Sequence, residues 1–178
     1  MIIGRDGLTE LNLPQTKECL MSVKITIDKS GWEKIKKNIV KDSGLSLNLG
    51  IFEESKYGPE NSNLQVAQVF QWMEEGDPVM YPPRPAFRVG FLPRLKTAEY
   101  VPLFQNAITS VLEGKATFKQ AYTKMGPVLV KGLQNEIIGW DTPPNSAKTI
   151  AEKGFNDPLI ASGRMLESVD FKVERGND

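Results

Sequence analysis

Alternation of apolar and polar side chains with a period of two predicts three β-strands. It occurs in residues 22–28, in residues 45–51 and in residues 169–174. A period of two turns one side of a strand towards a core and the other towards solvent. The apolar positions are, in chain order, Val23, Ile25 and Ile27, then Leu45, Leu47, Leu49 and Ile51, and finally Val169, Phe171 and Val173.

Apolar residues spaced three or four apart predict helices between these strands. The first would start with a capping box at Ser30, and a longer one would start with a capping box at Thr117 and bend at Gly126-Pro127. Another helix begins or kinks at Pro102. The predicted ranges are 30–41, 64–75, 102–114, 117–138 and 146–154, with a last short turn capped by Ser162.

This order of strands and helices predicts the α+β class. We expect a small mixed or antiparallel sheet of three to four strands, packed against helices and joined by long proline-rich loops. The first two strands can pair antiparallel or through a parallel crossover, and the sequence leaves both open. Residues 1–21 lack clear periodicity, so we expect an N-terminal arm there and a single domain over residues 22–178.

Composition narrows the functional classes. Lys plus Arg and Asp plus Glu both number 22, which argues against a dedicated nucleic-acid binder. The single cysteine, Cys19, excludes an intrachain disulfide, and no segment has the apolar length of a membrane span. The sequence contains no histidine and no glycine-rich phosphate loop. We therefore expect a soluble protein without a membrane partner, a histidine-based active site or a nucleotide site.

Adjacent acids leave one catalytic alternative open. The pairs Glu53–Glu54 and Glu74–Glu75 could hold a metal ion or act as acid and base, as in a carboxylate-dependent nuclease or wall hydrolase. Adjacent acids at loop edges are usually only solvated. We therefore expect no enzymatic activity, no cofactor and no metal.

The segment from Trp72 to Arg88 has the features of a contact surface. Four prolines within eight residues restrict its backbone, and two arginines project from it in this interpretation. The arginines could instead pair with the acids at the end of the preceding helix, and the aromatic residues could belong to a local core. The candidate interface residues are Trp72, Glu74, Glu75, Tyr81, Arg84, Phe87, Arg88 and Trp140.

Two segments together resemble the small neck and tail-completion proteins of tailed bacteriophages. The first comprises residues 72–76 (WMEEG) and 82–88 (PPRPAFR), and the second comprises residues 146–154 (SAKTIAEKG) and 158–168 (PLIASGRMLES). The family pattern is roughly Trp-x-Glu-aromatic-Gly with Pro-Pro-Arg-Pro-Phe-Phe-Arg, and later Pro-Leu-Ile-x-Thr-Gly with a following Ser. Glu75, Ala86 and Ser162 depart from it. The resemblance covers about residues 45–173.

This resemblance implies a virion structural protein at the junction of head and tail. Such a protein completes or terminates the tail as a ring of copies of itself, for example a hexamer. The implied partners are the tail-tube and head-connector proteins, with genomic DNA passing through the lumen without specific binding. Assembly would take place in the bacterial host cytoplasm. A chaperone that aids assembly without entering the virion is the remaining alternative.

Overall fold

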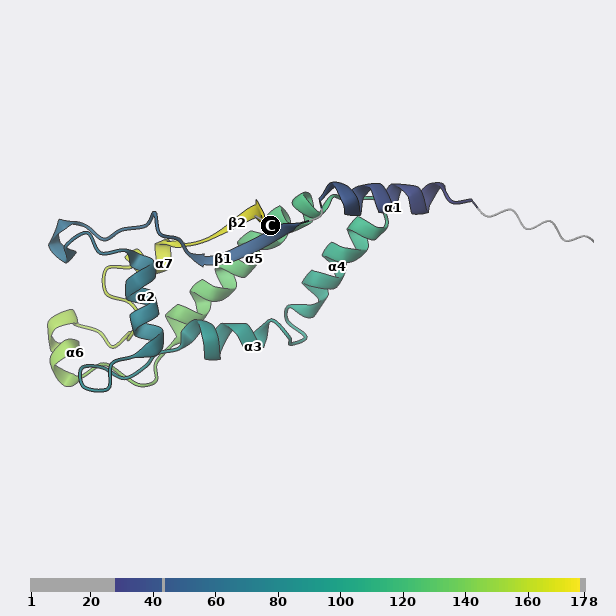
Figure 1. Ribbon diagram of the computed structural model, residues 1–178. Coiled ribbons are helices and arrows are strands. Elements are labelled where there is room, and N and C mark those ends of the chain that lie inside the picture. Colours follow the sequence, from purple (N-terminus) through teal and green to yellow (C-terminus); the bar gives the residue numbers. More distant parts are fainter. Residues whose placement is uncertain (1–27, 43, 177–178) are drawn as a thin grey trace, which may run out of the picture.

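The computed structural model describes residues 28–42 and 44–176. These residues form seven α-helices, one 3-10 helix, one π-helix and two strands (Figure 1). In chain order the elements are α1 (Ser30–Lys41), β1 (Leu45–Ile51), the 3-10 helix η1 (Pro59–Asn61), α2 (Val66–Glu75), the π-helix η2 (Ala86–Phe91), α3 (Leu92–Arg94), α4 (Val101–Leu112), α5 (Phe118–Gly139), α6 (Ala147–Lys153), α7 (Arg164–Glu167) and β2 (Val169–Arg175).

The sheet pairs a strand that follows the first helix with a strand at the end of the described chain. β1 pairs antiparallel with β2, with Leu45 opposite Arg175 and Ile51 opposite Val169. Both strands lie where alternation predicts them, and the mixed helix-and-sheet class is confirmed. The described residues contain two strands, however, and not the three to four expected. The predicted strand in residues 22–28 and the predicted arm in residues 1–21 lie outside the described residues, apart from Asp28.

Helix α5 is the central support of the fold. The predicted capping box at its start is present, since Thr117 Oγ1 accepts from the Gln120 amide and Gln120 Oε1 accepts from the Thr117 amide. The helix continues through Pro127 and packs against both strands, η2 and α4. Its buried residues are Ala121, Met125, Gly126, Leu129, Gly132, Leu133 and Ile137.

Most other predicted helix boundaries are confirmed within two residues. Pro102 lies in the first turn of α4, and Ser146 caps α6 by accepting from the Thr149 amide. One cap prediction is wrong, because Ser30 lies inside α1 and donates its amide to the Asp28 carboxylate. Gly163 is the residue directly before α7, and the Ser162 hydroxyl accepts from the amide of Arg164, the first residue of that helix, at 3.4 Å. A short polar side chain that precedes a helix can accept from the free amides of its first turn, and at α1 Asp28 does so instead of Ser30.

The arrangement in space is elongated (Figure 1). Helix α1 projects from one end of the body, next to the end of α4, whereas η1, α2 and α6 lie at the other end. Helices α4 and α5 form a helical hairpin, and α5 is the member of the pair that packs on the sheet. The α3–α4 segment diverges from α5 and then returns to it.

Gly126 of α5 allows the sheet to pack closely against this helix, which gives a stability prediction. A methyl group at Gly126 would overlap the ring of Phe171, whereas a methyl group at Gly139 would meet no atom within 4 Å. We expect Gly126→Ala to lower the free energy of unfolding by about 1–3 kcal/mol, because overpacking outweighs the gain in helix propensity. Gly139→Ala, the matched control, should leave it unchanged or raise it by up to about 1 kcal/mol. Urea unfolding of both variants checks this, and equal stability would contradict the packing.

Candidate functional site

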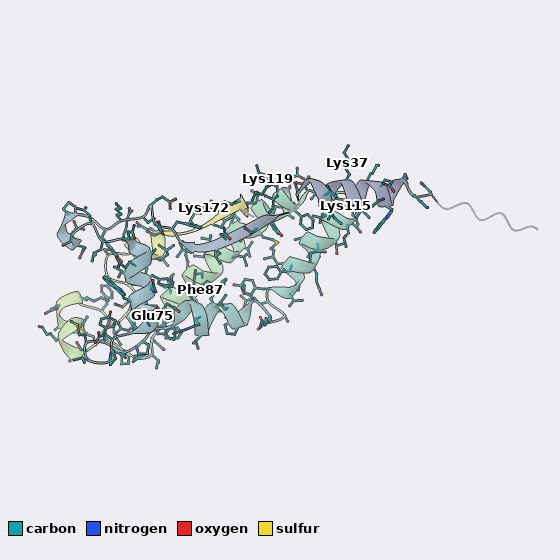
Figure 2. The ribbon with its side chains drawn as sticks, viewed as in Figure 1. Lys37, Glu75, Phe87, Lys115, Lys119 and Lys172 are labelled. Carbon is teal, nitrogen blue, oxygen red and sulfur yellow. The ribbon has the colours of Figure 1, made fainter. Side chains whose placement is uncertain are left out.

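The described surface contains an apolar groove with a volume of about 540 Å³. Its walls come from β1, η2, α3, α4 and α5, and Figure 2 shows Phe87 near its lower wall. The lining residues are Leu47, Leu49, Phe87, Phe91, Leu92, Leu95, Phe104, Ala107, Ile108, Phe118, Ala121, Tyr122, Met125 and Leu129.

The helical period explains why the groove is apolar. α5 presents Phe118, Tyr122 and Met125 along one side, and α4 presents Phe104 and Ile108 opposite them. Because α4 diverges from α5, these two apolar stripes do not close on each other, and Ile108 remains 53% exposed. The groove is therefore an apolar surface that the folded chain leaves partly uncovered.

The chemistry of the groove is limited. Tyr122 is the one lining residue with a titratable side chain, and no lining residue carries a charge at neutral pH. Phe87 and Phe91 stack at 6.1 Å between ring centroids, and the Tyr100 ring meets Phe91 edge-on at 5.9 Å. Such a surface can bury apolar side chains of a partner, but it offers no nucleophile or general base.

Glu74 fixes the position of Phe87 in the groove wall. Its carboxylate accepts from the backbone amides of Phe87 at 2.7 Å and Arg88 at 3.1 Å. Arg88 in turn donates through Nη2 to the Glu74 carbonyl at 3.1 Å. A carboxylate at the start of η2 and a guanidinium at the end of α2 both interact favourably with the local helix dipoles. The sequence prediction was that an arginine pairs with the acids at the end of α2, whereas the Arg88 guanidinium binds the backbone carbonyl of Glu74.

Arg84 does not project from the loop as predicted, since it is only 8% exposed. Its Nη2 donates to Asn145 Oδ1 at 3.1 Å, and its Nη1 donates to the Pro158 carbonyl at 3.4 Å. Its backbone amide donates to the Met73 carbonyl at 2.7 Å. Burial lowers the pKa of the guanidinium, yet arginine remains charged at any physiological pH. The sequence-based pairing of Arg84 with Glu74 or Glu75 is replaced by these neutral acceptors.

Arg84 thereby joins the two segments on which the resemblance to phage neck proteins rests. Residues 72–88 supply the guanidinium, and Asn145 and Pro158 belong to or border residues 146–168. Leu159 and Met165 of the second segment are buried in the same core as Phe70 of α2. The two segments, far apart in the sequence, therefore form one packed unit.

The other predicted site residues lie around this unit. Trp72 and Glu75 are exposed on α2, and Tyr81 exchanges two backbone hydrogen bonds with Asp77 in the tight loop that follows. Trp140 is half-buried against the core. Within the described chain, three buried donor atoms have no hydrogen-bond partner: Arg84 Nε, Trp140 Nε1 and Asn145 Nδ2.

The sequence does not predict the groove. It predicts the apolar stripes of α4 and α5 only as two separate helices. It does not predict η2 either, because the prolines before Ala86 indicate an extended chain. The sequence does contain one indication of the groove, which is the number of its apolar positions. Leu92, Phe104 and Ile108 are more apolar residues than a two-stranded sheet can bury.

Known proteins give no guide to this site. A scan against models of protein families finds no match to the chain, and comparisons with curated proteins and with solved structures find none either. In residues 28–42 and 44–176, no group of three or more acidic or cysteine side chains is arranged to hold a metal ion. No helix in those same ranges is long and apolar enough to cross a bilayer.

The buried position of Arg84 gives a second prediction. Arg84→Ala should lower the free energy of unfolding by about 2–4 kcal/mol, because it removes the hydrogen bonds of a buried cation to Met73 Sδ, the Pro158 carbonyl and Asn145 Oδ1 and leaves these acceptors unpaired. Arg88→Ala removes one exposed bond and should cost less than about 1 kcal/mol. Chemical unfolding of the two variants compares these effects. Equal losses, or a stable Arg84→Ala protein, would contradict the internal role of Arg84.

Proposed function

We propose that this protein is a structural subunit that assembles with copies of itself, and that its place is the neck of a tailed bacteriophage. There it would complete or terminate the tail and join it to the head. The observation that carries the proposal of assembly is the open apolar groove. The resemblance of residues 72–88 and 146–168 to phage neck proteins supports the place.

The groove favours assembly because uncovered apolar surface is unfavourable in water. Each Å² of apolar surface removed from water is worth roughly 25 cal/mol, so a partner that covers the groove gains stability. Leu92 and Ile108, which line the groove, are exposed as well. A contiguous apolar surface of this kind is typical of protein–protein contacts.

Features of the chain agree with a place in the neck. The resembling segments form one unit around Arg84, as expected if they serve a single structural purpose. The overall charge is balanced at 22 cations and 22 anions, so a ring of these subunits could let genomic DNA pass without gripping it. The tail-tube and head-connector proteins are the proposed neighbours.

A metal enzyme is the weaker proposal. Glu74 uses both carboxylate oxygens to accept backbone amides, and Glu54 forms an ion pair with Lys172 at 2.5 Å. These acids already have partners in the fold.

An assembly chaperone would use the same groove. The protein content of purified particles separates it from a virion subunit, because a chaperone would be absent from finished virions.

Assembly through the groove gives a third prediction. Ile108→Glu places a charge on the groove wall and should reduce the assembled fraction, with little cost to folding because Ile108 is already 53% exposed. Val128→Glu is the matched control, since Val128 is 47% exposed on α5 but does not line the groove. Light scattering over a concentration series measures the assembled mass. Unchanged assembly in Ile108→Glu, or an equal loss in both variants, would contradict the proposal.

A further inference from the structure

The second edge of β1 borders the groove. β2 pairs with one edge of β1, and among the described residues no further strand pairs with the other. Leu47 and Leu49 of β1 belong to the groove wall, next to the stripe of α5. A sheet edge with free backbone groups beside an apolar surface is suited to receive an added strand.

We propose that residues 22–28 of a second copy of this chain add to this edge of β1 and cover the groove. The proposal rests on the proposed self-assembly, but not on the phage context. Val23, Ile25 and Ile27 all lie on one side of the predicted strand, whereas Lys24 and Thr26 lie on the other. A strand placed along β1 would turn the apolar side towards α5 and the polar side towards solvent.

The groove matches this strand chemically. Its lining has no charged side chain, so three apolar residues can enter it without stranding a charge. The backbone of the strand would gain hydrogen bonds from β1, and the side chains would gain apolar contacts. Backbone pairing gives affinity in this mode of recognition, and the alternating side chains give specificity.

Chain length decides between the chain's own strand and that of a neighbour. α1 has 12 residues and is therefore about 18 Å long, and it projects from the body with Asp28 at its outer end (Figure 1). From Asp28, a fully extended chain reaches Ile25 within about 11 Å and Val23 within about 18 Å. The chain's own Val23 can therefore span no more than the length of α1, which leaves Leu47 and Leu49 beyond its reach. A neighbour's strand has no such restriction.

The surface of α1 agrees with a role as an arm. Trp32 is 58% exposed, and Ile39 on the same helix is exposed as well. Figure 2 shows Lys37 pointing away from the body on this projecting helix. An arm that carries an apolar strand to the groove of the next subunit uses two different surfaces, and such head-to-tail contacts close into rings or continue as open chains.

Cross-linking of the full-length chain tests the proposal. In a Cys19→Ser background, Ile25→Cys is made in one chain and Ala107→Cys, in the groove wall, in a second chain of different size. A short bis-maleimide reagent should join the two chains, and Thr26→Cys, on the polar side of the strand, should react at least about tenfold less. A chain with both Ile25→Cys and Ala107→Cys should give covalent multimers. An intramolecular product would overturn the second-copy proposal.

A second measurement separates this inference from the proposed function. Ile25→Asp should weaken self-association more than about tenfold, because one apolar side chain leaves the interface, whereas Thr26→Asp should not. Light scattering measures both, and melting temperatures confirm folding. If the wild-type protein assembles, yet Ile25→Asp assembles equally and no cross-link forms, the strand inference is wrong and self-assembly stands. If the wild-type protein stays monomeric without cross-links, both are wrong.

Discussion

Aromatic rings that pack directly on the backbone of α5 at two glycines determine the rest of the structure. At Gly126 the ring of Phe171 fills the space of a side chain, and at Gly132 the rings of Tyr100 and Phe91 do so. The sheet and η2 are thereby packed directly onto the helix backbone. Since both contacts use the same helix, the remaining apolar side of α5 is left to face α4, which diverges from it. The groove is a direct consequence of this packing.

A second, polar constraint connects the groove to the segments that resemble phage neck proteins. The buried guanidinium of Arg84 holds residues 145–158 against the end of α2, while Glu74 binds the backbone amides at the start of η2. Phe87 follows directly and enters the groove wall. The family-like segments thus build one wall of the surface that we propose for assembly. We expect changes in this unit to affect assembly through folding, because Arg84 and Glu74 bind groups of their own chain.

Local structure was largely predictable from the sequence, whereas long-range partners were not. The period-two strands predicted at 45–51 and 169–174, the capping box at Thr117 and a helix start near Pro102 all depend on neighbouring residues, and they are found within one residue of the expected place. The partner of Arg84 was predicted among nearby acids, but its acceptors lie 61 and 74 residues away. No local pattern encodes such a contact. The groove was missed for a similar reason, since it depends on the divergence of two helices whose stripes are each ordinary.

These constraints describe a subunit whose folded chain leaves apolar surface and a strand edge uncovered, and whose lining offers no catalytic group. Hydrogen–deuterium exchange tests this account most directly, because it reports on the β1 backbone without any substitution. Exchange is compared between dilute monomer and assembled protein, with the amides of residues 60–63 as an exposed reference. We expect assembly to slow exchange in β1 and in the groove-facing turns of α4, with no change in the reference. Equal exchange of β1 in both states would contradict the account.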